Sequence, residues 1–284
     1  MNRRKLSCFV CAFTALTGCY EPFSNDDILF LKAAPRGLEV SVPNKTGAGQ
    51  ALRVAQTGDD DTAARFYQDT RRAAEGVNEG VLSLLDMVDA VVAFEPTVRE
   101  EDQRIWGPFP VDGGNELALV VNRTRTATVV TFTSTSAPAQ ADAIYDYAML
   151  GRPIGGSDED YVSLFAGRSL PQASNRQGTG VMIVNFDGIR MLDPSSDGQG
   201  VLFLGYDTRD GRTVVEVAAD TMVSGMFEAD VAWVYRLEAS GAGRFNYFVR
   251  EDIVETTAQR ELLAIAARWM PDNRGRADVV VTQG

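Results

Sequence analysis

Histidine is absent from the 284-residue chain, and its three cysteines all lie within the first nineteen residues. The missing histidine excludes Ser-His-Asp and Cys-His catalysis, His-ligated zinc and a histidine-based pH switch. Because no cysteine follows Cys19, the rest of the chain also lacks disulfides and thiolate-ligated zinc. Any catalysis would therefore depend on carboxylates, Lys, Tyr or a metal held by oxygen ligands.

Common enzyme and cofactor motifs are also missing. Gly-x-Ser-x-Gly and Ser-x-x-Lys, which mark serine nucleophiles, do not occur. The Gly-x-Gly pairs at 178–180 and 198–200 precede predicted strands, whereas a dinucleotide-binding loop follows a strand and opens a helix. The acidic run 158–160 lacks EF-hand spacing, so helix capping explains it better than calcium. We therefore predict no enzyme activity, no catalytic residue, no cofactor and no metal site.

Basic residues are outnumbered by acidic ones, 27 against 39, which gives a formal net charge of −12. A surface this acidic repels nucleic acid and anionic lipid headgroups, so neither is predicted as a general partner. It favours solubility and is compatible with a cationic partner.

The N-terminal segment has three zones that together are typical of a secretory signal peptide. Residues 3–5 are basic, and residues 6–16 are mostly apolar but too few to cross a bilayer. The segment closes with Leu16-Thr17-Gly18-Cys19. We therefore predict a signal peptide over residues 1–18. The closing motif resembles the lipobox of bacterial lipoproteins, which implies that Cys19 is lipidated and becomes the first mature residue.

By this resemblance the mature protein faces the cell envelope and is attached to a membrane through the lipid on Cys19. Tyr20 stands where the inner-membrane retention signal of enteric bacteria has Asp, so the outer membrane is favoured over the inner one. Residues 19–59 are predicted to be a tether and entry segment, with a short helix around residues 28–31 and a short strand over 38–42. Residues 60–284 are predicted to form a single domain.

Residues 62–93 are predicted to form one long amphipathic helix. Apolar side chains, among them Val77, Val81 and Leu84, recur at steps of three or four residues, and charged side chains lie on the opposite side. The proline of Glu95-Pro96 ends the pattern because the residue before a proline disfavours helix. At 1.5 Å per residue the helix would be roughly 45 Å long.

After residue 102 the apolar period changes from 3.6 to 2, which predicts a β-sheet over residues 105–284. Asp-Gly pairs between alternating runs indicate antiparallel hairpins, so about ten strands should be neighbours in sequence order. The predictions include a turn at 123–125, a strand at 189–192 and a final hairpin after 262–269. Residues 151–178 interrupt the pattern and are predicted to be an irregular insertion, with a short helix from about 157 to 167. This insertion is either a functional loop or an ordinary surface loop.

The predicted fold class is α+β. A large curved antiparallel β-meander, an open half-barrel, would pack on helix 62–93. With its long helix, Trp106-Gly107-Pro108 and repeated Asp-Gly hairpins, the domain resembles lipoproteins of myxobacteria and their relatives. At the level of fold alone, the plan is similar to periplasmic lipoprotein carriers of the LolA and LolB type.

Two functions are compatible with these features. The first is a non-catalytic envelope protein that binds or scaffolds a protein partner. The second is a carrier or sensor of a lipid or other apolar ligand, held between the sheet and helix 62–93. An envelope hydrolase is disfavoured because nucleophile motifs and histidine are missing. The residues predicted to line the ligand cavity, unless they simply fill the core, are Val77, Val81, Leu84, Trp106, Trp233 and Trp269.

Overall fold

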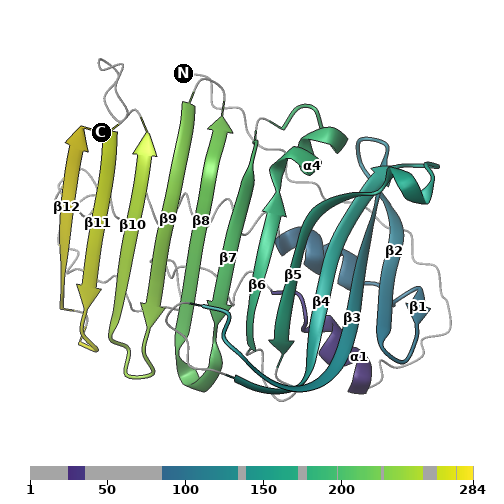
Figure 1. The fold of residues 1–284 in the computed structure, drawn as a ribbon, viewed down its shortest axis with the longest axis horizontal. Helices are drawn as coiled ribbons and strands as arrows, with labels where there is room; N and C mark the ends of the chain where they lie inside the picture. The colour runs from purple at the N-terminus through teal and green to yellow at the C-terminus, as the bar shows by residue number, and fades with distance from the viewer. Residues whose placement is uncertain are drawn as a thin grey trace.

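The computed structural model describes residues 25–35, 85–133, 139–171, 178–196, 198–224, 227–251, 261–272 and 274–283. Within them, most residues belong to one open, twelve-stranded antiparallel sheet (Figure 1). Its strands are β1 (Val98–Arg99), β2 (Gln103–Val111), β3 (Asn115–Val130), β4 (Ala139–Pro153), β5 (Val162–Pro171), β6 (Gly178–Asn185), β7 (Val201–Asp207), β8 (Thr213–Ser224), β9 (Phe227–Leu237), β10 (Gly243–Glu251), β11 (Glu261–Trp269) and β12 (Gly275–Gln283).

The strands lie side by side in sequence order, from β1 at one edge to β12 at the other. Each pairs antiparallel with the strands that precede and follow it in the chain, as the short turns predicted. Residues 262–269 belong to β11 and form the predicted final hairpin with β12, where Trp269 lies opposite Gly275. The prediction of a large antiparallel meander is therefore confirmed, with twelve strands where about ten were expected.

The two faces of the sheet differ in how far they are buried. Successive side chains along a strand point to opposite faces, so on β7 Leu204 is fully buried whereas its neighbour Phe203 is 38% exposed. We call the face that carries Leu204 the covered face and the face that carries Phe203 the open face. Large core side chains of the covered face include Leu119, Tyr147, Phe165, Met182, Leu204, Val217, Trp233, Phe245 and Ile265.

Two helical segments pack on the covered face, behind the strands in Figure 1. One is α1 (Asn25–Leu31), which confirms the short helix predicted near residue 28. The other is residues 85–92, where Leu85 and Val88 are fully buried in the same core cluster as the sheet. This second segment ends before Pro96, as predicted.

The contacts of α1 join it to strands β2, β3 and β4. The Phe30 ring packs edge-on against Tyr145, with 5.3 Å between the ring centroids. The guanidinium of Arg104 lies 4.6 Å from the centroid of the same ring, and that of Arg123 lies 5.1 Å from it. Arg104 Nε also donates to Asp27 Oδ1 at 2.6 Å, in an ion pair that is buried on both sides. This pair fixes α1 to the sheet.

Aromatic rings on the covered face lie over glycines of the neighbouring strand. A Cβ atom at Gly167 would collide with the hydroxyl of Tyr147, its direct register partner. The glycine thus leaves room for the ring, and the ring restores the apolar contact that glycine lacks. The Tyr147 hydroxyl donates to the carbonyl of Val181 at 3.0 Å. The same arrangement occurs in the register pairs Tyr206–Gly180 and Trp269–Gly243.

The predicted turn at residues 123–125 is wrong, because β3 runs through it without a break. Arg123 and Arg125 occupy strand positions, and both guanidiniums bind the carboxylate of Asp102. The prediction interpreted charged residues as a turn, although these arginines are strand residues whose charges are neutralised by Asp102. The only irregularity there is a register shift between Arg125 and Thr128.

The predicted irregular insertion at 151–178 is also wrong over most of its length. Ser157 does cap a short 3-10 turn, and its amide and hydroxyl both donate to Asp160. The expected helix from there to residue 167 is absent, because β5 occupies residues 162–171 and pairs with strands on both sides. The expected strand at 189–192 is instead part of α4 (Phe186–Leu192), which begins where Asn185 accepts a hydrogen bond from the Gly188 amide at 3.1 Å.

Several predictions fall on residues outside the described ranges. These are the signal peptide, the lipobox residues Leu16, Thr17 and Gly18 with Cys19, the strand at 38–42, and residues 62–84 of the long helix. Where the structure describes helices, none is long and apolar enough to span a membrane.

Candidate functional site

The tryptophans predicted to line a ligand cavity are all buried side chains of the covered face. Trp106, Trp233 and Trp269 are at most 6% exposed. Trp233 packs against Phe245 with 6.3 Å between ring centroids, and Trp269 stacks on Tyr235 at 6.0 Å. Trp106 lies on β2, far along the sheet from the other two. The three tryptophans belong to the buried hydrophobic cluster of the covered face, while Val77, Val81 and Leu84 lie outside the described residues.

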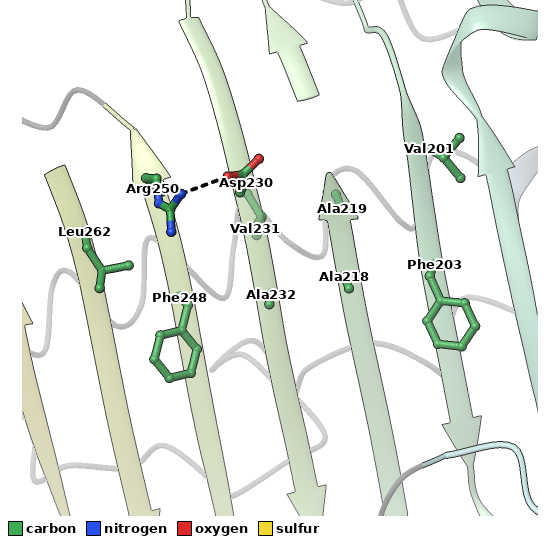
Figure 2. A pocket seen from close by; sticks show the side chains of 10 residues that line it. All are labelled: Val201, Phe203, Ala218, Ala219, Asp230, Val231, Ala232, Phe248, Arg250 and Leu262. Carbon is green, nitrogen blue, oxygen red and sulfur yellow. Dashed lines mark ion pairs between the residues drawn. The ribbon is translucent and has the colours of Figure 1, made fainter. Parts of the chain in front are cut away.

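A trough on the open face is the candidate functional site. Four side chains on four consecutive strands lie directly opposite one another in the register: Phe203 (β7), Ala218 (β8), Ala232 (β9) and Phe248 (β10). Figure 2 shows the two rings on either side of the two alanines. The phenylalanines are the walls and the alanines are the floor of a trough with a volume of about 740 Å³. At about 4.8 Å between strands, the two walls stand about 14 Å apart.

The apolar row continues across the whole sheet. Along this one register line, every side chain from β2 to β12 is apolar, and those farther from the trough include Ile183 and Val280, which are 48% and 53% exposed. A solvent-facing side of an antiparallel sheet normally carries polar residues. Contiguous exposed apolar surface instead marks a place where something binds. The remaining members of the row are Ile105, Val120, Ala148, Ala166 and Ala264.

The two ends of the trough differ. At one end lies the ion pair between Asp230 and Arg250, whose charged groups are 3.7 Å apart (Figure 2). At the other end a second hollow of about 310 Å³, lined by Glu216 and Asn246, continues it along the strands. Beside that hollow, on β7, Phe132 and Thr133 of the chain after β3 lie against Gly205, the register partner of Glu216. The trough therefore offers an apolar centre with polar groups at its ends.

The lining of the trough is mostly apolar. Its lining supplies apolar contact area, and the charged groups of Asp230 and Arg250 face each other. Within the described part of the chain, no group of three or more Asp, Glu, His or Cys side chains is placed to hold a metal ion. Two phenyl rings and a small-residue floor can bind an aliphatic or aromatic group by burial.

Sequence reasoning did not find this site, although a signal was present. The stretch Val201-Leu202-Phe203-Leu204 is apolar at both alternating positions, and so is Val231-Ala232-Trp233-Val234. We interpreted these runs only as strands with a buried face. When a strand carries apolar side chains on both of its faces and helices cover only one face of the sheet, the uncovered face is predicted to expose an apolar surface.

Comparison with known proteins gives no family for this chain: no family model matches it, and neither a curated protein nor a solved structure is significantly similar to it.

Proposed function

We propose that this protein is a non-catalytic binding protein of the bacterial cell envelope that takes an apolar partner on its open face. The observation that carries the proposal is the exposed row Phe203–Ala218–Ala232–Phe248. The main core cluster lies on the other face, and the small second cluster around Ile144 and Leu170 does not include these solvent-exposed aromatic side chains or the alanine floor between them. Phe203 and Phe248 are 38% and 47% exposed, so burial of that remaining area by a partner would release about 1 kcal/mol for each ring.

The proposal includes the membrane attachment expected from Leu16-Thr17-Gly18-Cys19. Lipid on Cys19 would hold the domain at the outer membrane, with the residues that precede α1 as its tether. Replacement of Cys19 by Ala should release the protein from membranes or leave its precursor unprocessed. Unchanged membrane attachment and processing would contradict the anchor without affecting the binding surface.

We further propose that helix 62–93 extends over the covered face. Trp233, Tyr235 and Ile265 are at most 2% exposed there, although α1 packs on the distant strands β2 to β4. A helix over residues 62–93 would be long enough to pack over these side chains and keep them from solvent.

Binding of a neutral apolar probe tests the function directly. The fluorescence of N-phenyl-1-naphthylamine should rise with the full-length protein, and Phe203→Ser with Phe248→Ser should weaken its affinity about tenfold or more. The control is Ile154→Ser, because Ile154 is 55% exposed in the turn after β4, away from the trough. Equal affinity for the parent protein and the double variant would overturn the proposal.

A carrier of a small apolar ligand is the second candidate. The trough volume of about 740 Å³ lies within the range of small-molecule sites, roughly 300–1,000 Å³. Native mass spectrometry after gentle extraction separates the two candidates. A co-purifying lipid of defined mass supports the carrier, whereas a ligand-free mass together with a co-purified protein that the double phenylalanine variant no longer retains supports the scaffold.

A further inference from the structure

A row of arginines crosses the last four strands on the open face. Arg236 (β9), Arg244 (β10), Arg268 (β11) and Arg276 (β12) are direct register partners, each opposite the next. Neighbouring strands are about 4.8 Å apart, so four positive charges are placed in one line. Like charges directly opposite each other destabilise a sheet. In a chain where acidic residues outnumber basic ones, this concentration of positive charge is unusual.

The two outer arginines have carboxylate partners. Arg236 Nε lies 2.6 Å from Glu238 Oε1, in an ion pair without hydrogen-bond geometry. Arg276 Nε donates to Asp278 Oδ1 at 2.8 Å. These two carboxylates neutralise the ends of the row and leave its centre positive.

The two inner arginines have no such partner. Among the residues that the structure describes, the side chains of Arg244 and Arg268 form no hydrogen bond and no ion pair. Arg244 Nε is moreover buried from solvent. A buried donor without an acceptor destabilises the folded protein, so an acceptor supplied by a ligand would be bound favourably.

Space for a ligand lies on both sides of Arg268. One hollow of about 500 Å³ is lined by Arg236, Arg244 and Arg268, and also by Glu238, whose carboxylate is paired with Arg236. A second of about 380 Å³ is lined by Arg268 together with Arg274 and Arg276. The inner arginines therefore border open volume into which their guanidinium groups can donate.

Protection of an exposed sheet edge does not explain the row. Charged side chains on an edge strand discourage pairing with other chains, and this accounts for Arg276 on β12. Arg244 and Arg268 stand on β10 and β11, which are paired on both sides. Protection of an exposed edge therefore does not account for these two arginines.

We propose that Arg244 and Arg268 form a binding site for a phosphate group. The planar guanidinium donates two parallel hydrogen bonds to phosphate oxygens, and two adjacent guanidiniums match a group with more than one negative charge. The acidic remainder of the surface repels extended polyanions, which favours a single phosphate over nucleic acid. Such a phosphate comes either from a free ion or from a lipid headgroup. Arg244 and Phe248 lie on the same strand and face, about 13 Å apart, so a phospholipid could place its headgroup on the arginines and its chain in the trough.

Titration of the full-length protein tests the site and distinguishes the two sources. Calorimetry with inorganic phosphate, and separately with dihexanoyl phosphatidic acid, should show binding by at least one probe. Arg244→Gln with Arg268→Gln should weaken that binding about tenfold or more, because two charge-assisted contacts are lost. Tighter binding of the lipid than of the free ion indicates a headgroup site, and equal binding indicates that the phosphate group alone is recognised. The matched control is Arg168→Gln, an open-face arginine that pairs with Asp146 on the neighbouring strand.

Thermal unfolding provides a second measurement. Phosphate should raise the melting temperature of the parent protein above its value in chloride at equal ionic strength, and the double variant should lose this increase. The proposal is overturned if neither probe binds, or if the double variant binds as tightly as the parent protein. Binding of the neutral naphthylamine probe should not change in the double variant, so a failure of this site is distinguishable from a failure of the trough.

Discussion

The covered and open faces of one sheet use the same kinds of residue for different purposes. On the covered face, Phe165 is fully buried and Tyr147 lies over a glycine of the next strand. On the open face, Phe203 and Phe248 project into solvent with alanines between them. Aromatic side chains of the covered face pack against other residues of the chain, whereas Phe203 and Phe248 of the open face remain exposed, and we propose that a partner covers them. An apolar strand position therefore reports function only when the face that it belongs to is known.

The largest difference in the free energy of unfolding is expected between two variants that each replace one phenylalanine, one on each face. Phe165→Ala leaves a cavity in the core and should lower the free energy of unfolding by about 3–5 kcal/mol. Phe203→Ala removes a ring that already contacts solvent and should cost less than about 1 kcal/mol. Urea unfolding of the two variants measures both values. A cost for Phe203→Ala as large as that for Phe165→Ala would show that the open face is not open.

Loss of an ion pair on the covered face should likewise destabilise the protein more than loss of one on the open face. Asp27→Ala leaves the buried guanidinium of Arg104 without its carboxylate and should destabilise the protein by about 3–5 kcal/mol. Asp146 pairs with Arg168 at 2.6 Å on the open face, where both side chains are largely exposed. Asp146→Ala should therefore change stability by about 1 kcal/mol or less. Equal melting temperatures for the two variants would contradict the role of the Asp27–Arg104 pair in holding α1.

The smallest expected effect concerns alkaline pH. Burial raises the pKa of the Tyr147 hydroxyl well above its usual range, and the nearby Tyr206 raises it further. The tyrosine of an unfolded chain ionises with its ordinary pKa of about 10. Above that pH the unfolded state loses a proton that the folded state keeps, so the free energy of unfolding falls as the pH rises.

Tyr147→Phe should remove this contribution and shift alkaline unfolding to higher pH. At neutral pH it should cost only about 1 kcal/mol, because the hydrogen bond to Val181 is lost. Every tyrosine in a described strand lies on the covered face, so open-face variants such as Phe203→Ala should leave the alkaline limb unchanged. A pH profile of Tyr147→Phe identical to that of the parent protein would contradict the assignment.

The antiparallel meander could be predicted because its signals are local. Alternating runs such as 143–149 and short turns such as 238–242 specify both strand and partner. The errors arose where tertiary contacts override local pattern. Arg123 can lie inside β3 because it packs over Phe30, and residues 186–192 form a helix because Asn185 caps it.

The candidate site could not be predicted for a related reason. Phe203, Ala218, Ala232 and Phe248 are separated by 14 or more residues each, and only the register of four strands brings them into line. The arginine row depends on register in the same way, since Arg236 and Arg276 are 40 positions apart in the sequence. Single-strand patterns fix which residues share a face, but the alignment of one strand with the next depends on turn length and bulges.

The sequential strand order also determines how this sheet responds to mechanical load. Within the described part of the chain, β12 pairs only with β11, so its removal would make β11 the new edge of the sheet. Tension applied at the C-terminal end would therefore separate the strand pairs one after another and not shear many hydrogen bonds at once. The arginine row and the trough lie toward this end, so extension of the last strands would dismantle the binding surface before the core beneath α1 gave way.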